Sequence, residues 1–297
     1  MTSGTEMQPW GAGPLFDFRQ SGCAPAPVLL SVPHAGRCYT PELIAWARVP
    51  EPTLWRLEDR YADLLIEDLV TRGFPALVAQ VPRAAIDLNR DPRDIDVRLV
   101  GAVPRGQPLI QSVKQRGGLG LFPRSLPRCG DLWRGVISWG EASSRIRLAH
   151  EPYHATLERE AELLRRRHGE VLLVDVHSMP PLPPLASGLP RPDVVIGDRF
   201  GTSASRTLAE IACSVIGAHG FVAALNHPYP GSYLIERHGK PESGRHALQI
   251  EISRDLYLDD QMESPGPGLR QVRRMLTQLV EELGRELGGR HWSEAAE

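Results

Sequence analysis

Residues 171–180, with the sequence VLLVDVHSMP, form the stretch that decides the fold. Five of the first six residues are Val or Leu, which is typical of a strand buried on both faces. The polar residues Asp175 and His177 are expected at the carboxyl end of this strand, where open α/β sheets build their sites. Taken alone, the segment is better explained by a core strand followed by a capped turn.

Three other stretches favour a functional explanation of these polar residues, because each runs from an apolar segment into residues suited to metal or carboxylate chemistry. They are SVPHAG (residues 31–36), AAIDLNRDP (84–92) and HALQIEISRD (246–255). Strands and helices alternate along the chain, and this order predicts an α/β fold with a mixed, mostly parallel central sheet flanked by helices. The four stretches are expected to come together at one edge of that sheet.

Hydrophobic periodicity and the positions of Gly and Pro predict the elements and the domain limits. Strands are predicted at residues 28–33, 76–81, 171–176, 193–197, 221–225 and 246–252. Helices are predicted at residues 41–48, 53–72, 143–168, 203–217 and 269–287, with Gly73 ending the second and Thr202 or Ser203 capping the fourth. Residues 28–290 are expected to form a single α/β domain, with a loosely ordered leader at 1–27, a tail at 291–297 and an irregular excursion at 91–142 near the site.

Composition speaks against several classes of protein. The chain has 297 residues, of which 41% are hydrophobic and 24% charged, so it can bury a sizeable core. A net charge of -2 speaks against a nucleic-acid partner. No apolar run reaches the roughly 18 residues of a membrane span. Four scattered cysteines and an amino terminus without a signal-peptide pattern predict reduced thiols and a cytoplasmic location, whereas the oligomeric state stays open.

A hydrolytic zinc site needs three protein ligands and one open position for water. His34 and His177 end different predicted strands and can converge if those strands are neighbours. Each histidine by itself is better explained by a hydrogen bond to a loop, but the two together favour a metal site. Asp59 is the candidate third ligand, on the predicted helix that follows the His34 loop, and Glu58 is the alternative. Acidic residues on an amphipathic helix usually form a solvated face, which is the competing explanation for both.

Glu251 lies inside the apolar stretch HALQIEI, where strand alternation places it with Gln249 on the face opposite three aliphatic residues. If helices cover that face, an ionised carboxylate there is costly without a partner. A buried carboxylate beside a metal-bound water is the kind of group that acts as a general base. A salt bridge to Arg254 is the structural alternative.

Asp87, Asn89 and Arg90 form the motif DxNR, which suits a substrate with a free carboxylate. An Arg fork binds a carboxylate in a bidentate way, and Asn adds directed donors. Arg83, a few residues earlier, can polarise a carbonyl group. The competing explanation is an ion pair within the loop, which we accept for the charged residues that follow the motif.

Two further residues are candidates for binding substrate. The stretch at residues 226–247 is polar, aromatic and broken by glycines, and Arg237 within it can line a pocket. Ser178 directly follows His177 and is the other candidate. A surface loop remains a competing explanation for the first stretch. The chain has no GxSxG motif, so a serine hydrolase is not expected.

Taken in order along the chain, these motifs resemble those of the N-formylglutamate amidohydrolase family. The similarity runs from residue 27 to residue 258 and covers SVPHAG, the segment of Asp59, DLNRDP, EPYHATLEREA, DVHSMP, RHGKP and HALQIEISRD. The combination is specific, even though each motif alone is not. The family is grouped with zinc carboxypeptidases and aspartoacylases, so the resemblance implies a phosphorylase/hydrolase-like, zinc carboxypeptidase-like α/β fold.

The resemblance also implies a metal centre with one zinc ion per chain. His34 and His177 would be two of its ligands. The HxxE spacing of carboxypeptidases is absent, because the residue three after His34 is Arg37. The acidic ligand is therefore inferred from the recurring Asp of the family, at the position of Asp59. Nickel, cobalt and iron stay open as the native metal.

The implied activity is that of a zinc amidohydrolase, which cleaves the N-acyl amide of a small carboxylate-bearing amino acid such as N-formylglutamate. In this scheme Asn89 and Arg90 hold the substrate carboxylate, and Glu251 is the general base. Arg237 is the candidate for holding a second, side-chain carboxylate. Arg83 or the metal steadies the oxyanion. Two alternatives remain: another zinc hydrolase on the same scaffold, either a carboxypeptidase or an aspartoacylase-like deacylase, and a non-catalytic descendant that binds an amino acid.

Overall fold

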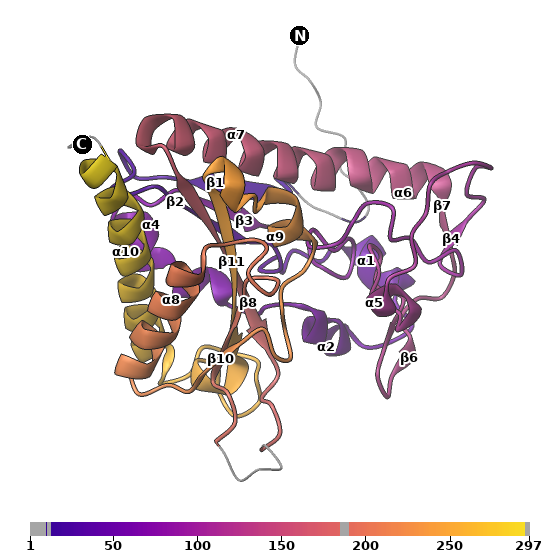
Figure 1. Cartoon of the computed structure of the whole chain (residues 1–297). Coiled ribbons are helices and arrows are strands. Elements are labelled where there is room, and N and C mark those ends of the chain that lie inside the picture. The colour runs from indigo at the N-terminus through magenta and orange to yellow at the C-terminus, as the bar shows by residue number, and fades with distance from the viewer. Residues whose placement is uncertain (1–9, 11–12, 185–189, 295–297) are drawn as a thin grey trace. The chain divides into compact units, whose positions relative to one another are not determined.

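A seven-stranded sheet forms the centre of the computed structural model (Figure 1). The structure describes residue 10 and residues 13–184 and 190–294, with side chains as far as residue 289. The strand order is β1-β3-β2-β8-β11-β9-β10. These strands are β1 (Phe16–Arg19), β2 (Val28–Val32), β3 (Ala76–Ala79), β8 (Val171–Met179), β9 (Val194–Gly197), β10 (Ala223–Leu225) and β11 (Arg245–Ser253).

The central sheet is mixed and mostly parallel, which confirms the predicted α/β class. β8 pairs in parallel with β2 and with β11, and β10 pairs in parallel with β9, whereas β11 and β9 are antiparallel. The helices α8 (Arg206–Ala218) and α10 (Leu269–Glu294) pack against each other on one side of the sheet, and α9 (Tyr233–His238) lies on the other (Figure 1).

β8 is longer than the sequence predicts. It runs through Met179, and all nine of its residues are buried. The reason is its partner: β11 pairs with β8 along the whole length, from Arg245 opposite Val171 to Ser253 opposite Met179. Asp175 and His177 therefore lie within the strand and not beyond its end.

Contacts between residues divide the chain into two compact units, each made of several segments. One unit comprises Met1–Asp17, Pro33–Arg60 and Val78–Ala155, and the other comprises Phe18–Val32, Tyr61–Leu77 and Thr156–Glu297. The first contains α1 (Pro41–Trp46), α2 (Glu51–Leu54), α5 (Val113–Arg116), α6 (Trp139–Arg145) and the short strands β4 (Val100–Gly101), β5 (Ser125–Leu126), β6 (Gly130–Asp131) and β7 (Ile137–Ser138). The second contains α3 (Ala62–Leu65), α4 (Glu67–Thr71) and most of the central sheet. The single domain expected at 28–290 stays a prediction.

The single helix predicted at residues 53–72 is wrong, because the helical segments α2, α3 and α4 break it up. A short 3-10 turn follows α2, the backbone is extended at Glu58, and Tyr61 adopts a positive φ of 59° before α3 begins. The backbone N–H of Asp59 donates to the carbonyl oxygen of His34 at 2.9 Å. That hydrogen bond replaces the one a continuous helix would form, so Asp59 lies in the break and not on a helix.

α8 begins at Arg206, so Ser205 takes the N-cap position and the predicted caps are wrong. The hydroxyl of Ser203 donates to the carbonyl oxygen of Ala247 at 2.8 Å, and that of Thr202 donates to Arg199 at 2.8 Å. Both hydroxyls are thus engaged outside the helix.

Other element ends also differ from the prediction. The helix predicted at 143–168 consists of α6, a π turn (Ile146–His150) and α7 (Glu151–His168), with Ser138 capping its start. α10 extends into the predicted tail, of which residues 295–297 lie outside the described residues. β1 lies in the predicted leader, of which residues 1–9 and 11–12 lie outside the described residues.

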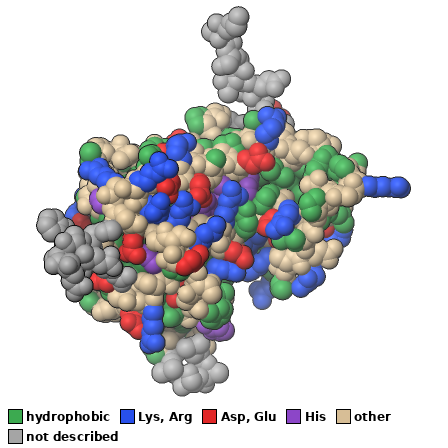
Figure 2. Space-filling view, turned by 45° about the horizontal axis from the view of Figure 1, so that its top comes forward, with side chains coloured by type: hydrophobic (Ala, Val, Ile, Leu, Met, Phe, Trp, Pro, Cys, Tyr) green, Lys and Arg blue, Asp and Glu red, His purple; other side chains and the backbone are tan. Residues whose placement is uncertain are grey.

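The surface shows no dominant charge on the face drawn in Figure 2, where Lys and Arg side chains are interspersed with Asp and Glu. Among the described residues, no helix combines the length and the apolar character needed to cross a membrane. The four cysteines, Cys23, Cys38, Cys129 and Cys213, are free thiols.

Candidate active site and metal centre

His34 lies in a tight turn after β2. A Cβ atom at Gly36 would lie 2.1 Å from the carbonyl oxygen of Val81, so the turn requires glycine there. The Nδ1 atom of His34 is 3.2 Å from Oδ2 of Asp59, and its Nε2 atom is 2.7 Å from Oδ1 of Asp87. All three side chains are buried, so the imidazole lies between two carboxylates.

Asp87 is fully buried and orients the His34 ring. Its Oδ1 also accepts the backbone N–H of Asn89 at 2.8 Å, and its Oδ2 accepts Nε of Arg83 at 2.8 Å. Burial by itself raises the pKa of Asp87, but the charges of Arg83 and Arg90 and the hydrogen bond with His34 hold that pKa well below its usual range. Asp87 therefore stays ionised and fixes the orientation of the imidazole.

A row of polar side chains crosses the three central strands. Ser31 on β2 and Gln249 on β11 are both register partners of Asp175 on β8, and Glu251 on β11 is the partner of His177. Residues paired across adjacent strands project to the same face of a sheet. The hydroxyl of Ser31 donates to Oδ1 of Asp175 at 3.1 Å, and Nε2 of His177 is 2.8 Å from Oδ2 of Asp175.

Glu251 is only 9% exposed and lies on the strand next to His177. Its Oε1 accepts a hydrogen bond from Nε2 of Gln249 at 2.8 Å. Nearby, Nε of Arg254 donates to the hydroxyl of Ser178 at 3.0 Å, and Ser178 is buried. Glu251 and His177 thus lie opposite each other on β11 and β8, whereas Ser178 is the register partner of Ile252 and projects to the other face of the sheet.

His34, Asp59 and His177 form a group that can hold a metal ion. Each offers one ligand atom, and these three atoms all lie within 4.8 Å of one another. Each histidine also has its Nε2 atom bound to a buried carboxylate, that of Asp87 or Asp175, as is usual for histidines that bind metals. Two imidazoles and one carboxylate are a donor set that fits zinc and leaves a position for water.

Glu58, the alternative acidic ligand, points to other partners. It is fully buried, and it accepts hydrogen bonds from the hydroxyl of Tyr39 at 2.7 Å and from Nη1 of Arg60 at 2.8 Å. Burial raises the pKa of Glu58, and burial together with the Glu58 charge raises that of Tyr39. The group that could hold a metal ion contains Asp59 and not Glu58.

The predicted substrate-binding arginines lie in different surroundings. Arg90 is 8% exposed, and its Nε donates to the carbonyl oxygen of Leu119 at 3.0 Å, within the excursion at 91–142. Its Nη1 donates to the carbonyl oxygen of Asn89 at 2.9 Å. Arg237, by contrast, is exposed on α9, and its Nη1 donates to the hydroxyl of Tyr233 at 2.9 Å.

Two buried histidines, His150 and His154, contact the DxNR segment. Neither was predicted as a site residue, although His154 lies in the motif EPYHATLEREA. Their Nε2 atoms lie 2.8 Å from the carbonyl oxygens of Arg90 and Leu88 respectively. The available signal was the spacing of the two histidines, four residues apart on one predicted helix, which places both on the same face.

The fold and the site define an α/β protein of the hydrolase type, with a candidate metal centre of two histidines and one aspartate. The family model of N-formylglutamate amidohydrolases matches residues 26–258. The chain therefore belongs to the N-formylglutamate amidohydrolase family, whose members hydrolyse amide C–N bonds.

Individual relatives agree with this assignment. The chain is 31% identical over 246 residues to an N-formylglutamate deformylase of Pseudomonas aeruginosa, covering 79% of this chain and 83% of the relative. It is 31% identical over 242 residues to the deformylase of Pseudomonas putida, with 79% and 82% covered. The crystal structure of N-formylglutamate amidohydrolase from Ralstonia eutropha is similar with a TM-score of 0.84 at 30% identity, covering 92% of this chain and 98% of that one.

Proposed function

We propose that this protein is a zinc-dependent amidohydrolase that removes the formyl group from N-formylglutamate. The observation that carries the proposal is the group of His34, Asp59 and His177, together with Glu251 as the strand neighbour of His177. The family and the names of the Pseudomonas and Ralstonia relatives supply the substrate.

The residues divide the chemistry between them. Zinc in such a site supplies a Lewis acid, which lowers the pKa of a bound water and polarises a carbonyl oxygen. Glu251 accepts the proton of the attacking water and later donates it to the leaving amine. Arg83 stabilises the negative charge that develops on the acyl oxygen. The amide C–N bond breaks, a C–O bond forms, and the products are formate and glutamate.

Other residues hold the substrate in place. Arg90 binds the α-carboxylate through its guanidinium group, and Asn89 adds directed hydrogen bonds. Arg237 binds the side-chain carboxylate of the substrate. Arg90 is already held by backbone carbonyls, so it loses little side-chain freedom when it binds an anion.

The first test is the metal content of the untagged protein, measured by elemental mass spectrometry in the wild type and in His177→Ala. We expect about one zinc per chain in the wild type and little in the variant. A catalytic zinc site has three protein ligands, and the substitution leaves only two. A wild type without metal, whose activity added zinc does not restore, would support the non-catalytic amino-acid-binding alternative instead.

The second test separates the proposed substrate from those of other zinc hydrolases. Matched N-formyl, N-acetyl and dipeptide derivatives of glutamate are compared by kcat/KM. We expect N-formylglutamate to be the best substrate. A preference for the N-acetyl compound would indicate a deacylase, and a preference for the dipeptide would indicate a carboxypeptidase.

A further inference from the structure

Two histidine rings bind the backbone on both sides of Asn89. Nε2 of His154 lies 2.8 Å from the carbonyl oxygen of Leu88, and Nε2 of His150 lies 2.8 Å from that of Arg90. A carbonyl oxygen only accepts hydrogen bonds, so each ring must carry a proton on Nε2. The residues before and after Asn89 are thus both anchored by side chains that lie about 60 positions further along the chain.

The two histidines come from a well-packed part of a helix. His150 ends the π turn, in which the backbone N–H of Glu151 bonds to the carbonyl oxygen of Ile146, and His154 lies in the first turns of α7. Both side chains are fully buried, and their ring centroids are 4.4 Å apart. A π turn changes which residues face inward and is frequent at functional sites.

The same segment is anchored to the metal-binding side as well. The backbone N–H of Asn89 donates to Oδ1 of Asp87, and that oxygen is also bound by Nε2 of His34. The segment from Asp87 to Arg90 therefore links a proposed metal ligand to the histidine pair. The position of Asn89 and Arg90 relative to His34 is fixed by these bonds.

We propose that His150 and His154 are positioning residues, which set where Asn89 and Arg90 meet the carboxylate of the substrate. The inference rests on the proposed role of Asn89 and Arg90 in binding that carboxylate. Neither histidine touches the substrate. Each acts through a backbone carbonyl next to a substrate-binding residue, so its loss weakens substrate binding and leaves the metal ligands in place.

The test compares His154→Asn with His154→Gln. The amide nitrogen of Gln reaches close to the place of Nε2 and can still donate to Leu88, whereas the shorter Asn cannot. We expect His154→Asn to raise KM for N-formylglutamate roughly tenfold, as the loss of one buried hydrogen bond implies, with kcat changed far less. His154→Gln is expected to restore most of the lost affinity. Zinc content stays that of the wild type in both variants.

A merely structural role predicts a different pattern, in which both substitutions impair kcat, KM and zinc content together. The inference is overturned if Gln at position 154 is as damaging as Asn, or if Asn leaves KM unchanged. If His154→Asn does not fold, the same Asn and Gln pair at His150 decides the question. His219→Asn, at a histidine that bonds to Gln278 outside the site, is the control. A wild type inactive on N-formylglutamate would overturn the proposed function itself.

Discussion

At the scale of single residues, the two histidines of the proposed metal centre share one arrangement. Nε2 of His34 is bound by Asp87 and Nε2 of His177 by Asp175, both through fully buried carboxylates. The carboxylate selects the tautomer and makes the ring a better ligand through the opposite nitrogen. Nδ1 is therefore the ligand atom that we propose for both histidines, and in His34 this atom faces Asp59.

Replacing Glu251 by Gln tests the proposed general base. Gln keeps the size of the side chain but does not take up a proton, so turnover should fall by roughly 100- to 10,000-fold. Zinc content should stay unchanged, because Glu251 is not among the proposed metal ligands. The measurements are kcat on N-formylglutamate and zinc per chain, with Glu263→Gln, at an exposed glutamate, as the control. Near-normal turnover of Glu251→Gln would remove this residue from the mechanism.

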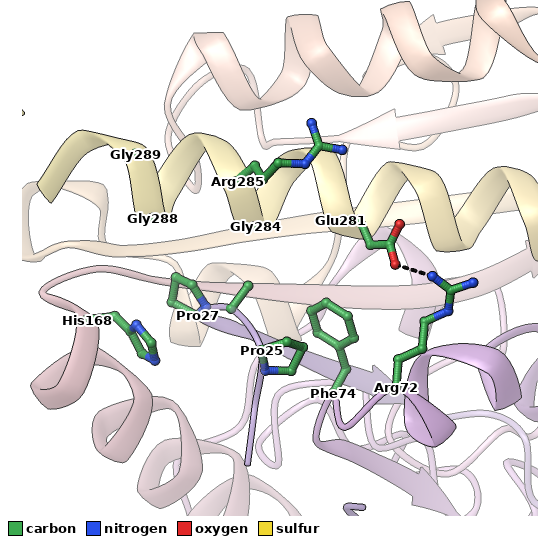
Figure 3. A pocket seen from close by; sticks show the side chains of 11 residues that line it. Pro25, Pro27, Arg72, Phe74, His168, Glu281, Gly284, Arg285, Gly288 and Gly289 are labelled. Carbon is green, nitrogen blue, oxygen red and sulfur yellow. Dashed lines mark hydrogen bonds and ion pairs between the residues drawn. The ribbon is translucent and has the colours of Figure 1, made fainter. Parts of the chain in front are cut away.

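At the scale of elements, the break between α2 and α3 and the glycines of α10 show how packing constrains the residue at a given position. Asp59 reaches the site because the chain leaves the helical path between α2 and α3. α10 carries three glycines that face a cavity of about 650 Å³, lined also by Pro25, Pro27 and Phe74 (Figure 3). Of these glycines, Gly284 packs closely, since a Cβ there would lie 2.7 Å from Cβ of Ala26, whereas a Cβ at Gly288 would meet nothing within 4 Å.

The two glycines should therefore respond in opposite ways to alanine. Gly288→Ala is expected to stabilise the protein by about 0.5–1 kcal/mol, because alanine loses less conformational entropy in a helix. Gly284→Ala is expected to destabilise it by about 1–3 kcal/mol through overpacking. Urea unfolding of both variants measures the difference. Two changes of the same sign would contradict the packing assigned to α10.

At the scale of the whole molecule, ion pairs join segments that are distant in sequence. Glu158 on α7 contacts Nδ1 of His238 at 3.3 Å and pairs with Arg245 at the start of β11. The hydrogen bond from His238 and the nearby Arg245 lower the pKa of Glu158 to about 2. Burial lowers the pKa of His238, so its ring is neutral at pH 7. Arg245 therefore supplies the positive charge that pairs with Glu158.

This ion pair predicts a defined pH dependence of stability. The pKa of Glu158 is lower in the folded state, so its contribution is present above the ordinary value of 4.5 and is lost as pH falls from there towards 2. Glu158→Gln should lower the free energy of unfolding at pH 7 by at most about 1 kcal/mol, because the carboxylate is nearly half exposed. Urea unfolding at pH 7 and pH 3 should show the difference shrinking at the lower pH. A difference that stays constant would disprove the assignment.

Local sequence patterns were enough to predict the mixed, mostly parallel sheet and most of its strands. They also identified His34 and His177, which follow or lie in apolar strand segments. The family motifs could be found in the same way, because hydrophobic periodicity and short motifs are local properties of a chain. The choice of Asp59 over Glu58 was inferred from the family and stays a proposal as a ligand assignment.

Only the tertiary structure decided features that depend on contacts between distant segments. β8 reaches Met179 because β11 pairs with it over its full length, and the helix predicted at 53–72 breaks where Asp59 bonds to His34. The positioning role proposed for His150 and His154 rests on their hydrogen bonds to carbonyl groups of another segment. Nothing in the local pattern of either segment encodes such a bond. It forms because buried backbone groups must find partners wherever packing places them.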